Sequence, residues 1–361
     1  MIFRFWKRFA AGLDGPLLTI VGLLMACGLA TVFSANADKF PSQIVSLLVA
    51  FTIMWLIAQV PPQKLQNLAL PAYIIGVALL IAVALFGDVS KGARRWLHVG
   101  VTRIQPSEVM KIAMPLMLAW YFSQRESALR WGHFLIAALI LLLPVALIAK
   151  QPDLGTAILV AAAGFYVIFL AGLPWKVMVA LGAAAGAIAP IAWSHMHDYQ
   201  RRRILTLIDP TSDPLGAGYH IIQSTIAVGS GGPFGKGWLN GTQAHLEFIP
   251  ERHTDFIFAV FSEEFGLLGN VILIGLYTAL IVRGLMIASE AGTFFGRLLA
   301  GAITLIFFTY AFVNMGMVTG ILPVVGVPLP FISYGGTALV TLFLGLGILM
   351  SIQRGRMLVQ K

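Results

Sequence analysis

The stretch MHDYQRRRILTLIDPTSDPLGAGYHIIQSTIAVGSGGPFGKGWLNGTQAHLEFIPERHTDFIFAVFSEE, residues 196–264, is the long polar interruption in an otherwise apolar chain. It holds consecutive arginines at 201–203, a glycine-rich turn region, and a closing cluster of acidic and basic residues from Glu247 to Asp255. Polar loops of this length in compact proteins are usually functional or disordered. Because aliphatic and aromatic residues recur throughout this one, we expect an ordered, functional loop that the remainder of the chain holds at one face of a membrane.

Composition assigns the chain to the membrane proteins. Of its 361 residues, 58% are hydrophobic and 11% are charged, and the mean hydropathy is +0.87. Runs of about 20 apolar residues cross a bilayer as helices, because each segment must satisfy its own backbone polar groups. The only cysteine, Cys27, lies in the first apolar run, so the chain can form no internal disulfide or cysteine metal site. We expect an all-α, polytopic membrane protein.

Ten apolar segments have the length of membrane spans. The first is too long for a signal peptide and has no cleavage pattern after it, so we expect it to be retained. An even number of spans places both termini on one side, and we treat residues 1–361 as a single membrane domain. The predicted spans lie near 16–34, 42–60, 68–87, 107–122, 132–149, 155–172, 174–193, 264–283, 298–320 and 331–352.

The distribution of basic residues predicts the orientation. With the termini inside, the cytoplasmic segments hold twelve of the 24 lysines and arginines, against seven that lie in the outer connections or, for Lys111, at the outer start of a span. The remaining five lie in the long loop, which is too long to weigh heavily in the positive-inside rule. We therefore expect residues 1–15 and 353–361 in the cytoplasm, and the loop 195–263 outside the cytoplasmic membrane.

The outer face carries basic residues that the orientation bias should have removed. Lys91, Arg94, Arg95 and Arg103 crowd one outer connection, and the arginines at 201–203 add to them. One interpretation is adhesion to anionic lipid headgroups. The other is a binding site for an anionic substrate such as a phosphate or pyrophosphate. The residues alone leave both open.

Two motifs suggest more chemistry than their residues support. The run Gly229–Gly237 lacks the spacing of a nucleotide-binding loop and no strand precedes it, so we interpret it as a turn. His195, His197, His253 and Glu251 lack the spacing of a structural metal site, and we predict none.

Several polar residues stand at the ends of predicted spans. Asp153 is either the N-cap of the sixth span or a functional residue. Glu108 and Lys111 are three residues apart on one helix face, and we expect them to pair and to line a cavity. Asn314 and Ser333 are explained by helix-packing contacts.

Helix length predicts where Asp255 lies. From Asp255 to Arg283 a straight helix of 28 steps would be about 42 Å long, whereas the hydrocarbon core is about 30 Å thick. With Arg283 at the inner interface, residues 255–261 should project beyond the lipid or lie along its surface. Asp255 would then sit at the outer rim, where it could act as a catalytic carboxylate or cap the helix beginning at Phe256.

A series of short motifs lies along the chain: Arg94-Arg95-Trp96; Gln105 to Glu108 with Lys111; Gln151 to Gly155; Gly216 to His220 with Gln223-Ser224; Gly235 to Gly237; Pro250 to Phe256; Asn314; Gly320 to Pro323; Gly326-Val327; and Phe331 to Ala338. In these motifs the chain resembles the SEDS family (shape, elongation, division and sporulation), over essentially its whole length. The run from Lys236 to Asp255 and the short termini are more similar to the elongation branch than to the division branch.

The resemblance implies a peptidoglycan glycosyltransferase. Such an enzyme polymerises lipid II into glycan strands at the outer face of the cytoplasmic membrane during elongation and rod-shape maintenance, and releases polyprenyl pyrophosphate. The implied partners are a class B penicillin-binding protein, which crosslinks the strands, and other membrane proteins of the elongation complex; nucleic acid is not among them. Two alternatives are a lipid II flippase and a non-catalytic scaffold, the second of which would leave the basic outer surface unexplained.

The family's essential acid falls on Asp255, which could take the proton of the attacking sugar hydroxyl. The departing pyrophosphate needs positive charge placed in advance but no acid to protonate it, unlike the leaving group of a hydrolysing glycosidase. No cofactor is firmly implied, although a divalent cation (Mg²⁺ or Mn²⁺) bound with the pyrophosphate is left open. The residues expected to bind substrate are Arg94, Arg95, Glu108, Lys111, Asp153, Arg201, Arg202, Lys236, Glu251, Arg252, His253 and Ser333.

Overall fold

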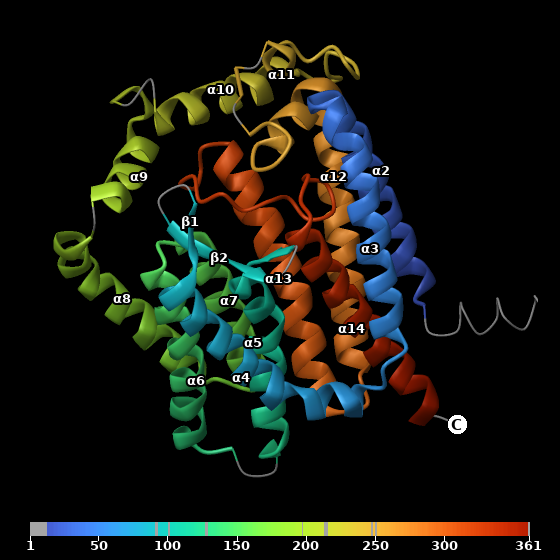
Figure 1. The fold of residues 1–361 in the computed structure, drawn as a ribbon, viewed down its shortest axis with the longest axis vertical. Coiled ribbons are helices and arrows are strands. Elements are labelled where there is room, and N and C mark those ends of the chain that lie inside the picture. The colour runs from blue at the N-terminus through green and yellow to red at the C-terminus, as the bar shows by residue number, and fades with distance from the viewer. Residues whose placement is uncertain are drawn as a thin grey trace, which may run out of the picture.

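The protein is a bundle of long helices with a helical arch over one end (Figure 1). The computed structural model describes residues 13–90, 93–99, 102–126, 129–196, 198–212, 216–246, 248–249 and 251–359. A helix overlaps each of the ten predicted spans. These helices are α2 (Gly15–Ala35), α3 (Phe40–Ala58), α4 (Pro62–Phe86), α5 (Pro106–Ser123), α6 (Trp131–Lys150), α7 (Leu154–Leu170), α8 (Trp175–His195), α12 (Ile257–Glu290), α13 (Phe294–Val318) and α14 (Thr337–Val359).

Seven helices among the described residues are long and apolar enough to cross a membrane. The other three are α5, which carries Glu108 and Lys111, α7, which is short, and α8, whose apolar part is also short. The chain is therefore a multi-pass membrane protein. Proline at the first or second position starts α2, α3, α4 and α5, where its missing amide would have had no helical partner.

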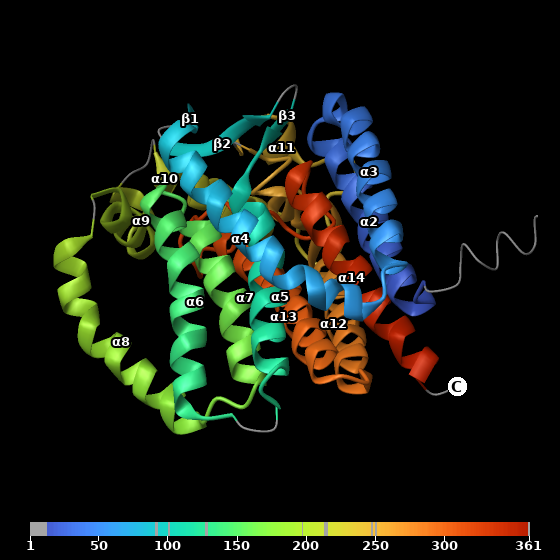
Figure 2. The same ribbon diagram turned by 60° about the horizontal axis from the view of Figure 1, so that its bottom comes forward.

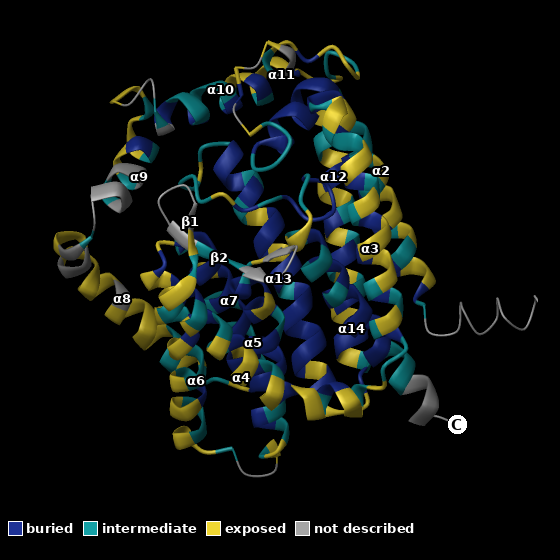
Figure 3. Ribbon diagram, in the orientation of Figure 1, coloured by how far each residue is buried: buried dark blue, intermediate teal, exposed yellow. Residues whose placement is uncertain are grey.

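Helix α13 is the centre of the bundle, packed between α12, α5 and α7. Figure 3 shows it almost continuously buried, whereas α6 is mainly exposed or intermediate and the described part of α8 is mainly exposed. Figure 2 shows α4, α5, α6 and α7 as one group of neighbouring helices. The central position of α13 allows its polar residues to serve a site at its end.

The prediction of an all-α fold is wrong in one connection. Three strands form an antiparallel sheet there: β1 (Asp88–Ser90), β2 (Ala93–Val99) and β3 (Thr102–Ile104), in the order β1-β2-β3. Leu97 pairs with Ile104 and Asp88 with Trp96. Strands this short are easily missed beside ten apolar helices, and this sheet holds Arg94 and Arg95 on β2.

The prediction that the eighth span is a straight helix is also wrong. Within α12, Gly266 has φ 63° and ψ −160°, which breaks the helix into a short first part and a long second part. All side chains from Ile257 to Glu264 are buried. The segment that was expected to project beyond the lipid or lie along its surface therefore turns into the protein, because the helix axis changes direction at Gly266.

The tenth span starts later than predicted. Helix α14 begins at Thr337 rather than at 331, and the chain from Gly320 to Gly336 is irregular. Phe331, Ile332 and Ser333 are nevertheless buried. Gly28 of α2 makes this possible, since a Cβ there would lie 2.7 Å from the Cα of Ile332. We call residues 320–336 the re-entrant segment.

The described residues of the segment 195–263 are mostly helical. This segment contains α9 (Asp198–Ile208), η3 (Pro210–Ser212), α10 (Ala217–Ser230) and α11 (Thr242–His245). Helix α10 arches over the top of the bundle and packs on α12, whereas α8 and α9 lie to the side (Figure 1).

Candidate active site

Asp255 lies where the re-entrant segment meets the end of α13. Asn314 Nδ2 donates a hydrogen bond to the Asp255 carbonyl oxygen at 2.8 Å and a second to Val327 O at 2.7 Å. Gly326 has φ 72°, and a Cβ there would lie 3.2 Å from Asp255 Oδ2. The N-cap of α12 is Phe256, with no side-chain capping bond, so Asp255 does not have the capping role.

Ser333 also fixes the backbone beside Asp255. Its hydroxyl donates to Thr254 O at 2.7 Å and accepts from the amide of Leu329 at 2.7 Å. The amide of Tyr334 donates to His253 O at 2.8 Å. Asn314 and Ser333 were predicted to serve helix packing; instead, both hold the chain around Asp255.

Cationic side chains surround this backbone on the side of α2 and α3. Arg252 Nε donates to Ala35 O at 2.7 Å. The ring of Tyr334 lies 5.6 Å from that of His253, and Lys39 Nζ lies 5.9 Å from the Tyr334 ring centroid. Burial, reinforced by the charges of Lys39 and Arg252 and opposed by Glu251, lowers the pKa of His253. Its ring is therefore neutral at pH 7, while Glu251 stays exposed.

Glu108 and Lys111 form the predicted pair on one face of α5. Lys111 Nζ lies 2.5 Å from Glu108 Oε1, and both residues are buried. The same ammonium lies 5.1 Å from the ring centroid of Tyr310 on α13. A buried charge persists only when it is paired, so this pair must be retained as a unit.

Asp153 is the N-cap of α7, one of the two roles that the sequence left open, and it also contacts side chains at the start of α5 and on the sheet. It caps α7 by accepting from the amide of Thr156 at 3.3 Å. Its Oδ2 also accepts from Gln105 Nε2 at 3.1 Å and lies 3.9 Å from Arg95 Nε. Arg95 of the sheet is thereby tied to the start of α7.

These clusters converge on the same end of the bundle through α13 and the re-entrant segment. Tyr310 and Asn314 are one helical turn apart, a rise of about 6 Å. Tyr310 faces Lys111, and Asn314 holds Asp255. Beside them, a Cβ on Gly155 would lie 2.7 Å from Val325 O, so the start of α7 touches the re-entrant segment.

An apolar cavity of about 680 Å³ leads to this end of the bundle. Helices α3, α4, α5 and α14 line it, mostly with aliphatic side chains, and Gln105 and Glu108 contribute polar groups. Glu108 thus lines the cavity and pairs with Lys111, as predicted, whereas Lys111 itself is not among the lining residues. The volume falls within the range of about 300–1,000 Å³ that is typical of ligand pockets.

Other predicted binding residues lie apart from Asp255 or outside the description. Arg201 donates from Nε to Trp193 O at 2.9 Å and from Nη2 to Ser194 O at 2.7 Å, which caps the end of α8. Lys236 pairs with Glu263 at 2.6 Å. The side chains of Arg94 and Arg202 lie outside what the structure describes. Among the described residues, no group of three or more His, Cys, Asp or Glu could hold a metal ion.

Sequence reasoning missed Lys39, Tyr310 and Tyr334 at this site. Tyr310 precedes Asn314 by one turn, a spacing that places both on one helix face and could have indicated it. The only indication for Lys39 was its position on a predicted outer connection, where the positive-inside rule disfavours basic residues.

The fold and the site together define a multi-pass helical membrane protein in which α13 contacts both the backbone of Asp255 and a buried ion pair beside an apolar cavity. A family model described as "Cell cycle protein", for FtsW, RodA and SpoVE, matches residues 14–357. The chain belongs to this family, the SEDS proteins.

The chain is similar to curated relatives over nearly its whole length. It is 50% identical to "Peptidoglycan glycosyltransferase MrdB" of Escherichia coli strain K12, covering 99% of this chain and 97% of the relative. It is 31% identical to "Peptidoglycan glycosyltransferase RodA" of Treponema pallidum, covering 96% and 98%.

Two solved structures resemble the fold. One is described as "Structural coordination of polymerization and crosslinking by a peptidoglycan synthase complex", with a TM-score of 0.83 at 35% identity, covering 95% of this chain and 98% of the other. The rod shape determining protein RodA of Thermus thermophilus gives a TM-score of 0.73 at 29% identity, covering 95% and 97%.

Proposed function

We propose that this chain is a peptidoglycan glycosyltransferase that polymerises lipid II during cell elongation and rod-shape maintenance. The relatives named as peptidoglycan glycosyltransferases support glycosyl transfer. The observation that carries the proposal is the geometry at the end of α13. There, one helix contacts both the buried Lys111 beside the apolar cavity and the backbone of Asp255.

In the proposed topology all ten helices cross the cytoplasmic membrane, as one domain of residues 1–361. Both termini are cytoplasmic, and the loop 195–263 is outside, so Asp255 works at the outer face. A cysteine at exposed Ser212, in a Cys27→Ser background, should react with a membrane-impermeant thiol reagent on intact spheroplasts. Labelling only after the membrane is broken would reverse the orientation.

Asp255 is the general base in the proposed mechanism. Its carboxylate takes the proton of the acceptor sugar hydroxyl while the oxygen attacks the anomeric carbon of the donor. The bond to the pyrophosphate breaks, and the polyprenyl pyrophosphate departs with the electron pair. The bonds from Asn314 and Ser333 hold the backbone on both sides of the carboxylate, which reduces the loss of entropy at the reaction step.

The cavity between α3, α4, α5 and α14 takes a polyprenyl chain, because its lining is aliphatic and its polar end meets the charged cluster. Lys111, Arg95 and His253, with their partners Glu108, Asp153, Glu251 and Arg252, then bind the pyrophosphate and sugar. A divalent cation would arrive with the pyrophosphate and be held by its oxygens. Arg94, Arg201 and Arg202 would attract the anionic substrate from farther away.

A class B penicillin-binding protein is the proposed partner. The solved structure described as a peptidoglycan synthase complex coordinating polymerization and crosslinking supports this pairing. Other membrane proteins of the elongation complex would join at surfaces that we leave unassigned.

The test is polymerisation by purified components. Full-length protein with lipid II, with and without a class B partner, should yield glycan strands resolvable on a gel. Protein that moves lipid II across liposome membranes but makes no polymer even with its partner would favour a flippase. Protein that does neither would favour a scaffold.

A further inference from the structure

The glycine-rich run 231–237 closes the break in α12. A helix break leaves carbonyls without partners before it and amides without partners after it. Two amides after the break donate to the glycine-rich run, and two amides of that run donate to carbonyls before the break. The bonds are Leu267 N to Gly232 O (2.9 Å), Leu268 N to Pro233 O (3.0 Å), Lys236 N to Glu263 O (3.0 Å) and Gly237 N to Glu264 O (3.0 Å).

Glycine is required where these two backbones touch. A Cβ on Gly231 would lie 2.1 Å from Ser262 O, and one on Gly235 would lie 2.1 Å from Glu264 O. A Cβ on Gly266 would lie 2.3 Å from the amide nitrogen of Gly235. The run that superficially resembles a nucleotide-binding loop is thus an ordered clasp, which we call the glycine clasp (residues 231–237).

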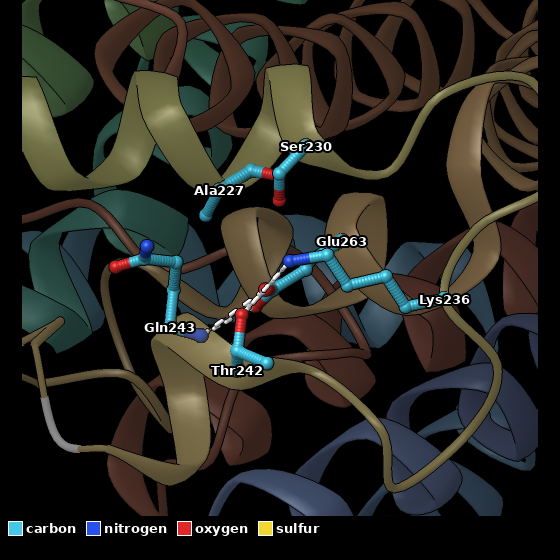
Figure 4. Close-up of polar contacts among 6 residues, drawn as sticks. All are labelled: Ala227, Ser230, Lys236, Thr242, Gln243 and Glu263. Carbon is cyan, nitrogen blue, oxygen red and sulfur yellow. Dashed lines mark hydrogen bonds and ion pairs between the residues drawn. The ribbon is translucent and has the colours of Figure 1, made fainter.

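Glu263 fastens the glycine clasp and α11 to the first part of α12. Its side chain is fully buried and accepts from Lys236 Nζ at 2.6 Å and from Thr242 Oγ1 at 3.0 Å. The amide of Gln243 donates to both carboxylate oxygens, at 3.1 and 3.2 Å. Figure 4 shows Lys236, Thr242 and Gln243 gathered around this carboxylate. A buried carboxylate with several donors is expensive to disturb.

The first part of α12 connects Glu263 to Asp255 over a short distance. The two residues are eight positions apart, about 12 Å along a helix, and every side chain from Ile257 to Glu264 is buried. A displacement at Glu263 is therefore passed to Asp255 with little room for local relaxation, because close-packed interiors transmit strain. A shift of about 1 Å in a reacting group can reduce the rate by about 10²-fold.

We propose that Glu263 and Lys236 are positioning residues that hold Asp255 in its reactive place. This inference rests on the proposed function. It gives Lys236 a different role from the substrate binding predicted from the sequence, since its ammonium is engaged by Glu263 and Thr242. Glu263 itself is 0% exposed, so it cannot meet a substrate.

The test compares kcat and KM for lipid II polymerisation by full-length variants with the class B partner present. Glu263→Gln should lower kcat by about 10²-fold with KM changed by about twofold or less. Lys236→Met should lower kcat less, because Thr242 and Gln243 still hold the carboxylate, and Lys236→Arg should recover most of the loss. Amide hydrogen exchange at 235–237 and 267–268 should accelerate in step with the fall in kcat.

The matched control is Glu126→Gln, which removes an exposed ion pair to Arg297 of 3.3 Å; kcat should stay at the wild-type value. A rise in KM with unchanged kcat in Lys236→Met would overturn the positioning role and restore substrate binding. Wild-type kcat in a folded Glu263→Gln protein would also overturn it. Should Glu263→Gln fail to fold, Lys236→Met and Lys236→Arg decide the matter. Absence of polymer from the wild type would instead refute the proposed function itself, and the inference with it.

Discussion

Helices α13 and α6 are both apolar and of membrane length, but they occupy opposite environments. In the most apolar part of α13, 67% of the residues are buried, against 17% in α6. Between His133 and Lys150, α6 carries no polar side chain, whereas α13 carries Thr304, Thr309, Tyr310 and Asn314. Lipid tails offer no hydrophobic driving force between helices, so polar and small residues decide which helix becomes central. The difference teaches that hydropathy locates a span, whereas its polar residues locate it within the bundle.

The largest effect should follow from removing the charge of Asp255, which α13 holds in place. Asp255→Asn keeps the shape but cannot accept a proton, so polymerisation should fall by about 10²–10⁴-fold. Gel analysis of glycan strands would measure this, with the thermal midpoint taken on the same preparation. Asp209→Asn, an exposed aspartate of the same loop, should polymerise normally. Long strands from a folded Asp255→Asn protein would refute the assignment.

The second-largest effect should follow from replacing Lys111, which contacts Tyr310 of α13. Its replacement leaves Glu108 buried without its cationic partner. Breaking one side of a buried pair destabilises by about 3–5 kcal/mol, so Lys111→Met should lower both the thermal midpoint and polymerisation. The assay belongs in detergent, where no anionic bilayer is present. Lys150→Met, at the exposed end of α6, is the control. Loss confined to anionic membranes would show that this charge serves lipid adhesion instead.

Substitutions that change only packing should have a smaller effect, and they should lower the free energy of unfolding more in α13 than in α6. Ile303 of α13 is 1% exposed, and Ile303→Ala should cost about 2 kcal/mol through the cavity it leaves. Leu139 of α6 is 59% exposed, and Leu139→Ala should stay within about 0.5 kcal/mol of wild type. Equal losses of unfolding free energy at the two sites would show that α6 is covered by protein rather than by lipid.

The smallest effect should come from His253, outside the spans. Its folded pKa is lowered, mainly by burial, so below a pH of about 6.5 the unfolded chain binds the proton more readily. The thermal midpoint should therefore decline as the pH falls from 7 to about 5. His253→Gln should flatten part of that decline. An identical pH profile for the two proteins would mean that the histidine is not held neutral.

Sequence patterns located all ten helices and the Glu108–Lys111 ion pair, but not the bends in the chain. Gly266, Gly269, Gly275 and Gly284 lie in the same apolar run, and only Gly266 breaks α12. The reason is a segment some thirty residues earlier that donates and accepts the missing backbone bonds. Local spacing cannot reveal such a partner. For the same reason the pair Glu108–Lys111 was predictable within one helix turn, whereas the contact of Lys111 with Tyr310 was not.

The way in which the re-entrant segment completes the site has a consequence for biogenesis. Gly28 packs against Ile332, and Gln43 donates to Ser333 O across 290 positions of sequence. Asn314 and Ser333, which hold the backbone around Asp255, are also synthesised after it. A nascent chain that ends after α12 therefore contains Asp255 but none of these restraints. The catalytic activity proposed for Asp255 would then arise only when translation is almost finished, so that incomplete chains would be inactive.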